Sequence, residues 1–66
     1  MENTIRVERA KKHITQADLA EKVSVSRQTI HAIETGKFVP STVLALKIAR
    51  FFKVKIEDIF TLEEND

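Results

Sequence analysis

Apolar residues recur at three- and four-residue spacing on both sides of a short break in the segment QADLAEKVSVSRQTIHAIE, residues 16–34. This spacing places the apolar side chains of each half on one face of an α-helix. Because only a short turn separates the halves, the two helices are expected to pack against each other near a right angle, as a helix-turn-helix. The expected inward residues are Ala17, Leu19, Ala20, Val23, Val25, Ile30 and Ile33.

Helix signals also cover the rest of the chain. Side-chain oxygens stand where they would accept bonds from the first backbone amides of a helix. The expected N-caps are Asn3 or Thr4, Thr15, Ser26 and Ser41. Gly36 suits the left-handed backbone that ends a helix. The expected helices therefore cover about 4–12, 16–24, 27–35, 42–53 and 56–60.

The fourth of these helices is apolar on too much of its surface to lie only at the edge of a fold. Its apolar residues are Val43, Leu44, Leu46, Ile48, Ala49 and Phe52. No alternation long enough to build a sheet occurs elsewhere. The predicted fold class is therefore all-α, a compact five-helix bundle in which residues 61–66 form a short extended segment or a frayed tail.

Length and composition limit what this chain can do. Its 66 residues predict a single domain, and the absence of cysteine together with only two histidines predicts no metal site and no cofactor. No apolar run approaches the roughly 20 residues that a membrane span needs, so we expect no membrane partner and a cytoplasmic location. Residues 1–55 hold all 11 Lys and Arg, whereas half of the 10 acids lie in the last 11 residues. A basic body with an acidic tail is compatible with a nucleic-acid partner.

The helix over 27–35 carries side chains suited to reading DNA. If Ile30 and Ile33 point inward, a rotation of about 100° per residue puts the polar positions outward. Arg27 would pair with guanine and Gln28 with adenine in the major groove of double-stranded DNA, and Ala32 would meet a thymine methyl. His31 is a further candidate for reading bases, with a phosphate contact or a merely solvated side chain as the open alternatives. The residues expected at the DNA backbone are Gln16, Ser26, Thr29, Thr35 and Lys37.

The segments ITQADLAEKVSVSRQTIHAIETGKFVPS and LALKIARFFKVKIEDIF resemble the Xre/Cro-type helix-turn-helix family, which includes phage repressors. The resemblance implies the five-helix DNA-binding fold of those repressors over nearly the whole chain. It also implies that Gln16 contacts phosphate and braces Arg27, and that Arg9 pairs with Glu34. Chemistry supports that pair, since a carboxylate after two inward isoleucines needs a partner. The chain departs from the family at Glu8, where a leucine or aromatic residue is common, and at Ser24, where glycine is usual.

The C-terminal segment 56–66 is expected to form a dimer seam. The apolar run from Phe51 to Leu62 exceeds what so small a monomer hides, and Ile56, Phe60 and Leu62 are the candidate interface residues. A dimer would present two recognition helices to a palindromic operator. The sequence thus predicts a homodimeric transcriptional repressor and not an enzyme. The alternative is an antitoxin-like protein that binds a toxin partner and autoregulates its operon.

Overall fold

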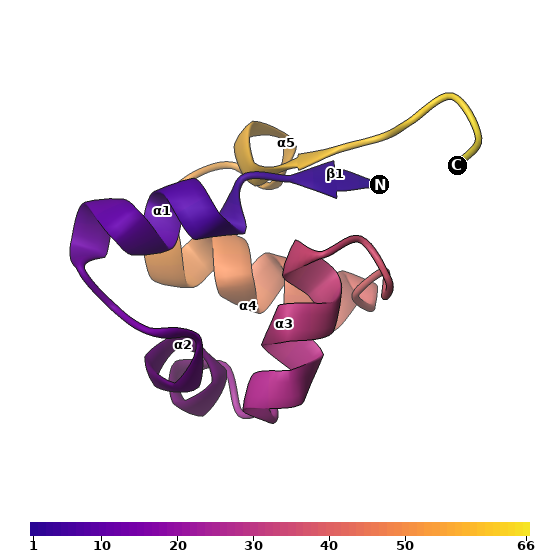
Figure 1. The fold of residues 1–66 in the computed structure, drawn as a ribbon. Coiled ribbons are helices and arrows are strands. Elements are labelled where there is room, and N and C mark those ends of the chain that lie inside the picture. Colours follow the sequence, from indigo (N-terminus) through magenta and orange to yellow (C-terminus); the bar gives the residue numbers. More distant parts are fainter.

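A computed structural model describes all residues, 1–66, as five short helices and one small sheet (Figure 1). Each expected helix is present, and its ends lie within about two residues of the prediction. The elements in chain order are β1 (Glu2–Asn3), α1 (Ile5–Lys12), α2 (Gln16–Lys22), α3 (Arg27–Glu34), α4 (Thr42–Phe52), α5 (Ile56–Ile59) and β2 (Phe60–Thr61). No helix is long and apolar enough to cross a membrane.

Three of the expected side-chain caps form. The hydroxyls of Thr15, Ser26 and Ser41 accept hydrogen bonds from the amides of the third residue of α2, α3 and α4, at 3.0 to 3.1 Å. Thr15 also belongs to a capping box, because its own amide donates to Asp18 at 2.9 Å. At α1 the N-cap residue is Thr4, whose side chain makes no cap bond. These bonds satisfy amides that have no partner within the helix.

The core draws on all five helices and β2. The fully buried side chains are Ile5, Leu19, Ile30, Ile33, Ile48 and Ile59. Ala17, which was predicted to face inward, is exposed, and so are Val43 and Leu46 on the helix that was predicted to be too apolar for the surface. For α4 the reason is geometric, since this helix is covered on one side only. Leu44, Ala45, Ile48, Ala49 and Phe52 already fill that side.

The prediction of an all-α fold is wrong in one respect, because the two ends of the chain pair as a sheet. β1 runs antiparallel to β2, with Glu2 opposite Thr61 and Asn3 opposite Phe60. The amide of Thr4 extends this pairing by donating to the carbonyl of Ile59 at 2.9 Å. Two-residue strands are too short to produce a recognisable alternation in the sequence. No pairing was therefore predicted, and an extended segment was only one of the two alternatives for residues 61–66.

A residue with a positive φ lies on each side of α3. Ser24, in the turn before it, has a φ of 61°, and Gly36, directly after its C-cap, has a φ of 79°. Ser24, at the position where the family usually has glycine, therefore has a left-handed backbone, although a side chain there costs roughly 1 kcal/mol. Gly36 adopts the same region without that cost.

Candidate nucleic-acid interface

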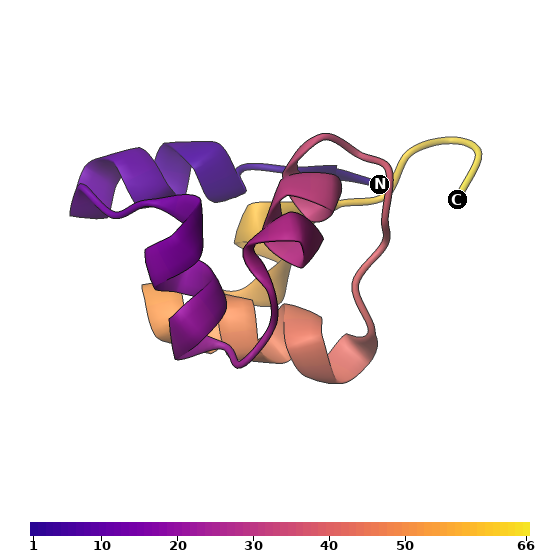
Figure 2. The ribbon, with the colours of Figure 1, turned by 60° about the horizontal axis from the view of Figure 1, so that its bottom comes forward.

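The turn between α2 and α3 is short and internally bonded. The amide of Val25 donates to the carbonyl of Ala20 at 3.0 Å, and Ala20 itself is 3% exposed. A small side chain at this position allows the two helices to approach closely. Figure 2 shows α2 and α3 joined by this turn, with α4 beside the pair. The predicted helix-turn-helix geometry is therefore present.

The outer face of α3 carries the side chains that were predicted to read bases. Ile30 and Ile33 are buried, whereas Arg27, Gln28 and His31 are exposed. Ala32 is half-buried. The side chains of Arg27 and Gln28 make no hydrogen bond or ion pair within the protein. The first turn of α3 therefore presents a guanidinium and an amide that are free to bind a ligand.

The hydroxyls beside these residues are already engaged. Ser26 and Thr29 share a hydrogen bond of 2.9 Å between their side-chain oxygens. The Thr35 hydroxyl donates to the carbonyl of His31 at 2.9 Å. Lys37, in contrast, is exposed and has no ion-pair partner. Of these four residues, Lys37 thus offers the donor most available to a phosphate.

A buried ion pair locks α3 to α1, as both the resemblance and the burial argument predicted. Arg9 donates from Nε and Nη2 to the two carboxylate oxygens of Glu34, at 2.6 and 3.0 Å, and from Nη1 to the carbonyl of Ile14 at 3.1 Å. The side chain of Glu34 is 1% exposed and that of Arg9 is 15% exposed. Because Arg9 gives a bidentate contact, the orientation of α3 against α1 is closely defined.

Electrostatics at this pair favour the charged forms. Burial alone would raise the pKa of the Glu34 carboxyl, but hydrogen bonds from Arg9 and Gln16 and the charges of Arg9 and Arg6 outweigh it and lower that pKa. The bond to Glu34 raises the pKa of Arg9 in turn. Glu34 is therefore an ionised acceptor at neutral pH.

Gln16 has other partners than those the resemblance implied. Its amide nitrogen donates to Glu34 Oε1 at 3.2 Å and lies 3.3 Å from His31 Nδ1, and it makes no bond to Arg27. Because the amide nitrogen of Gln16 already contacts both Glu34 and His31, a phosphate contact from Gln16 requires its side chain to leave one of these partners. Sequence reasoning identified Gln16, His31 and Glu34 separately. Gln16 is the first residue of α2, and His31 and Glu34 lie one turn apart on α3. This placement could have predicted that the three side chains meet.

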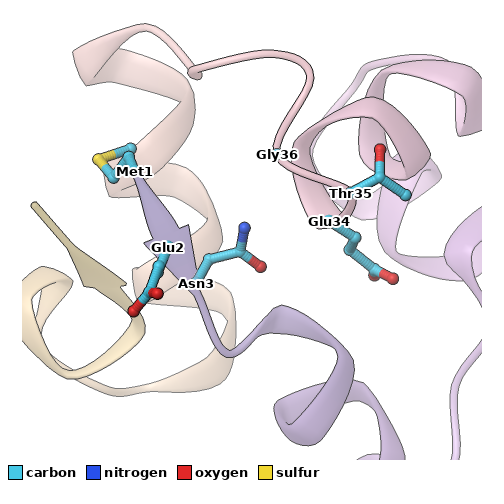
Figure 3. A pocket seen from close by; sticks show the side chains of 6 residues that line it. All are labelled: Met1, Glu2, Asn3, Glu34, Thr35 and Gly36. Carbon is cyan, nitrogen blue, oxygen red and sulfur yellow. The ribbon is translucent and has the colours of Figure 1, made fainter. Parts of the chain in front are cut away.

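Asn3, one of the two residues expected to cap the first helix, bonds to the first amide of α1 and also makes a tie to α3 that the sequence did not predict. Its side-chain nitrogen donates to the carbonyl of Ile33 at 2.9 Å, and its oxygen accepts from the amide of Ile5 at 3.2 Å. β1 is thereby tied to the last turn of α3. A hollow of about 370 Å³ lies at this junction, and Figure 3 labels its lining residues, Met1, Glu2, Asn3, Glu34, Thr35 and Gly36. The Glu34 carboxylate points away from β1 (Figure 3), and its partners Arg9 and Gln16 lie on α1 and α2.

The three candidate dimer residues differ in how much surface they retain. Leu62 is 77% exposed. Ile56 is partly buried and packs against the core. Phe60 is 8% exposed and belongs to the core of the single chain. Leu62 therefore offers the largest apolar surface of the three to a partner.

Comparison with known proteins places this arrangement in a family. The helix-turn-helix family matches residues 5–59, from the start of α1 to the end of α5. An uncharacterized HTH-type transcriptional regulator of Methanocaldococcus jannaschii is 58% identical over 66 residues, and one of Bacillus subtilis, YgzD, is 48% identical, with all of each chain covered. The HTH-type transcriptional activator BcrR of Enterococcus faecalis is 39% identical over 56 residues, which span 85% of this chain and 28% of BcrR. The chain belongs to the Xre/Cro-type helix-turn-helix family of DNA-binding transcriptional regulators.

Proposed function

We propose that this regulator is a homodimeric, sequence-specific repressor that inserts α3 into the DNA major groove. The observation that carries the proposal is the state of Arg27 and Gln28. Both lie in the first turn of α3, exposed and without partners, on a helix fixed by the buried pair of Arg9 and Glu34. A recognition helix of this kind reaches base edges with its N-terminal residues.

The chemistry of each side chain indicates its role. Arg27 donates two bonds to guanine O6 and N7, and Gln28 pairs with adenine N6 and N7. The methyl group of Ala32 meets the thymine methyl. The groups proposed for the DNA backbone are Ser26, Thr29, Thr35 and Lys37, together with Gln16, which would reach a phosphate by leaving Glu34 while it keeps its contact with His31. Lys37 supports this proposal best, because its ammonium group is exposed and has no ion-pair partner.

Two copies of the chain would recognise a palindromic site. Paired recognition helices contact half-sites about 34 Å apart. We place the seam at the C-terminal segment, with Leu62 and Ile56 at its centre and Phe60 behind them. The high exposure of the Leu62 side chain supports this placement of the seam. A repressor then acts by occupying a promoter.

The decisive experiment is selection of bound sequences from a random duplex pool with the purified protein at two salt concentrations. Enrichment of a palindrome with half-sites about one helical turn apart is the expected result. If nothing is enriched and binding only fades with salt, the proposal of sequence-specific repression is wrong. The antitoxin-like alternative, with a toxin as the main partner, would then be the hypothesis to test.

Two substitutions distinguish a contact with a base from a contact with a phosphate. Gln28→Ala is expected to weaken binding to the selected duplex by about tenfold while leaving binding to a random duplex unchanged, since a bidentate base contact discriminates by ~1–3 kcal/mol. Lys37→Ala is the matched control. Loss of a phosphate contact weakens binding to both duplexes alike and lowers the salt dependence by about one unit of slope. Equal losses in the Gln28 variant would contradict its base-reading role.

A further inference from the structure

A continuous chain of hydrogen bonds runs from the buried pair to the outer face of α3. Arg9 on α1 holds Glu34, Glu34 accepts from Gln16 at the start of α2, and the same amide nitrogen of Gln16 lies 3.3 Å from Nδ1 of His31. The chain thus ends on an exposed imidazole.

Charge fixes the direction of every bond in this chain. The Glu34 carboxylate is ionised and only accepts, so the nitrogen of Gln16, and not its oxygen, has to face it. A flipped amide would place its carbonyl oxygen against the carboxylate. One hydrogen of the Gln16 amide is directed to Glu34, and the other points to His31.

The amide orientation in turn fixes the tautomer of His31. An amide nitrogen donates and does not accept, so Nδ1 of His31 has to be the acceptor. In the neutral ring the proton then lies on Nε2, the nitrogen on the far side of the imidazole. His31 therefore presents a single N–H donor to solvent.

We infer that His31 is a further specificity-determining residue, whose Nε2–H donates to an acceptor on a base edge in the major groove. The inference rests on the proposed function of α3. His31 follows Arg27 by one helical turn and lies on the same exposed face of α3, so both side chains would enter the same groove. Guanine, with O6 and N7, offers two such acceptors, whereas cytosine offers a donor there. We expect guanine to be favoured and cytosine to be excluded at the contacted strand position.

The tautomer is tested on the free protein by ¹⁵N NMR of the histidine rings, at a pH where the imidazole is neutral. The expected spectrum has Nε2 protonated and Nδ1 bare, and Gln16→Ala is expected to shift the Nδ1 resonance because its donor is lost. A proton on Nδ1, or an Nδ1 chemical shift that is unchanged in the Gln16→Ala variant, would overturn the inference. This measurement needs no DNA, so it is independent of the proposed function.

Base reading is tested by repeating the selection with His31→Ala and His31→Gln. The alanine variant is expected to lose preference at one position of each half-site and to bind the selected duplex about tenfold more weakly. The glutamine variant, which keeps an outward N–H donor, is expected to restore binding. Equal loss on a random duplex would mean a phosphate contact, and an unchanged preference would mean a solvated ring. Either result overturns the role of His31, whereas absence of any enrichment with the native protein overturns the proposed function itself.

Discussion

Replacing Arg9 by methionine would leave the Glu34 carboxylate buried without its main partner. Methionine fills a similar volume but returns neither the bidentate contact nor the bond to the carbonyl of Ile14. Removing one partner of a buried pair costs about 3–5 kcal/mol. We expect a loss near the lower end, about 3 kcal/mol, because Gln16 and Arg6 still face the carboxylate. In a domain of this size that loss lowers the melting temperature by about 12 to 24 °C.

Circular dichroism during thermal and urea unfolding measures this loss of stability. The loss is also expected to depend on pH. The pKa of Glu34 is lowered in the folded protein, so its stabilising effect is complete above the unfolded value and disappears as the pH falls through the folded one. The difference in unfolding free energy between the native protein and Arg9→Met should therefore narrow as the pH falls toward and below about 4, because protonation removes the unpaired charge of the variant as well as the paired charge of the native protein. If Arg9→Met does not fold, Arg9→Lys, which keeps the charge but not the forked geometry, should give an intermediate loss.

Two further variants decide whether burial is the cause. Arg9→Met combined with Glu34→Met removes both charges and should recover much of the lost stability, because no unpaired charge remains in the core. Lys11→Met is the matched control on the same helix, since the lysine that pairs with Glu8 at 3.3 Å is itself exposed to solvent. Its expected loss is below about 0.5 kcal/mol. If Arg9→Met cost no more than Lys11→Met, the argument from burial would be wrong.

Three other substitutions have defined outcomes. Ser24→Gly should raise the free energy of unfolding by about 0.5–1 kcal/mol, because glycine has no Cβ atom to clash at a φ of 61°. A lower melting temperature would contradict this. Leu62→Glu should weaken the dimer in sedimentation experiments and Val43→Glu, an equally drastic change at another exposed site, should not; an unchanged dimer would move the seam elsewhere. Asn3→Ala should cost about 1 kcal/mol and accelerate hydrogen exchange at the Thr4 amide, since the tie to Ile33 is lost; unchanged exchange would show that this tie does not hold β1.

The helices of this protein were predictable because their signals are local. Thr15, Ser26 and Ser41 each act on amides within three residues, and Gly36 acts on its own backbone. The spacing of Ile30 and Ile33 likewise settled which face of α3 points outward. Such information is contained in a few consecutive residues, so it can be extracted from one sequence.

The failures involve information that is not local. The sheet depends on residues at opposite ends of the chain, and neither strand is long enough to reveal itself. On α4, Val43 and Leu46 are as apolar as their buried neighbours, so nothing in the sequence distinguishes the covered side from the exposed one. The amide of Gln16 had several partners within reach, and only its rotamer chooses Glu34 and His31 over Arg27.

The pairing of β1 with β2 also predicts an order of events during folding. The contacts of α2 with α3 join near neighbours in the chain, whereas the sheet closes a loop of almost the full length. The entropy of loop closure makes the sheet costlier to form by roughly 1.5 kcal/mol. The recognition unit should therefore assemble before the ends meet, and native-state opening should begin at the ends. A dimer seam built on β2 would then order the least stable part of each copy, so association would suppress the first step of unfolding.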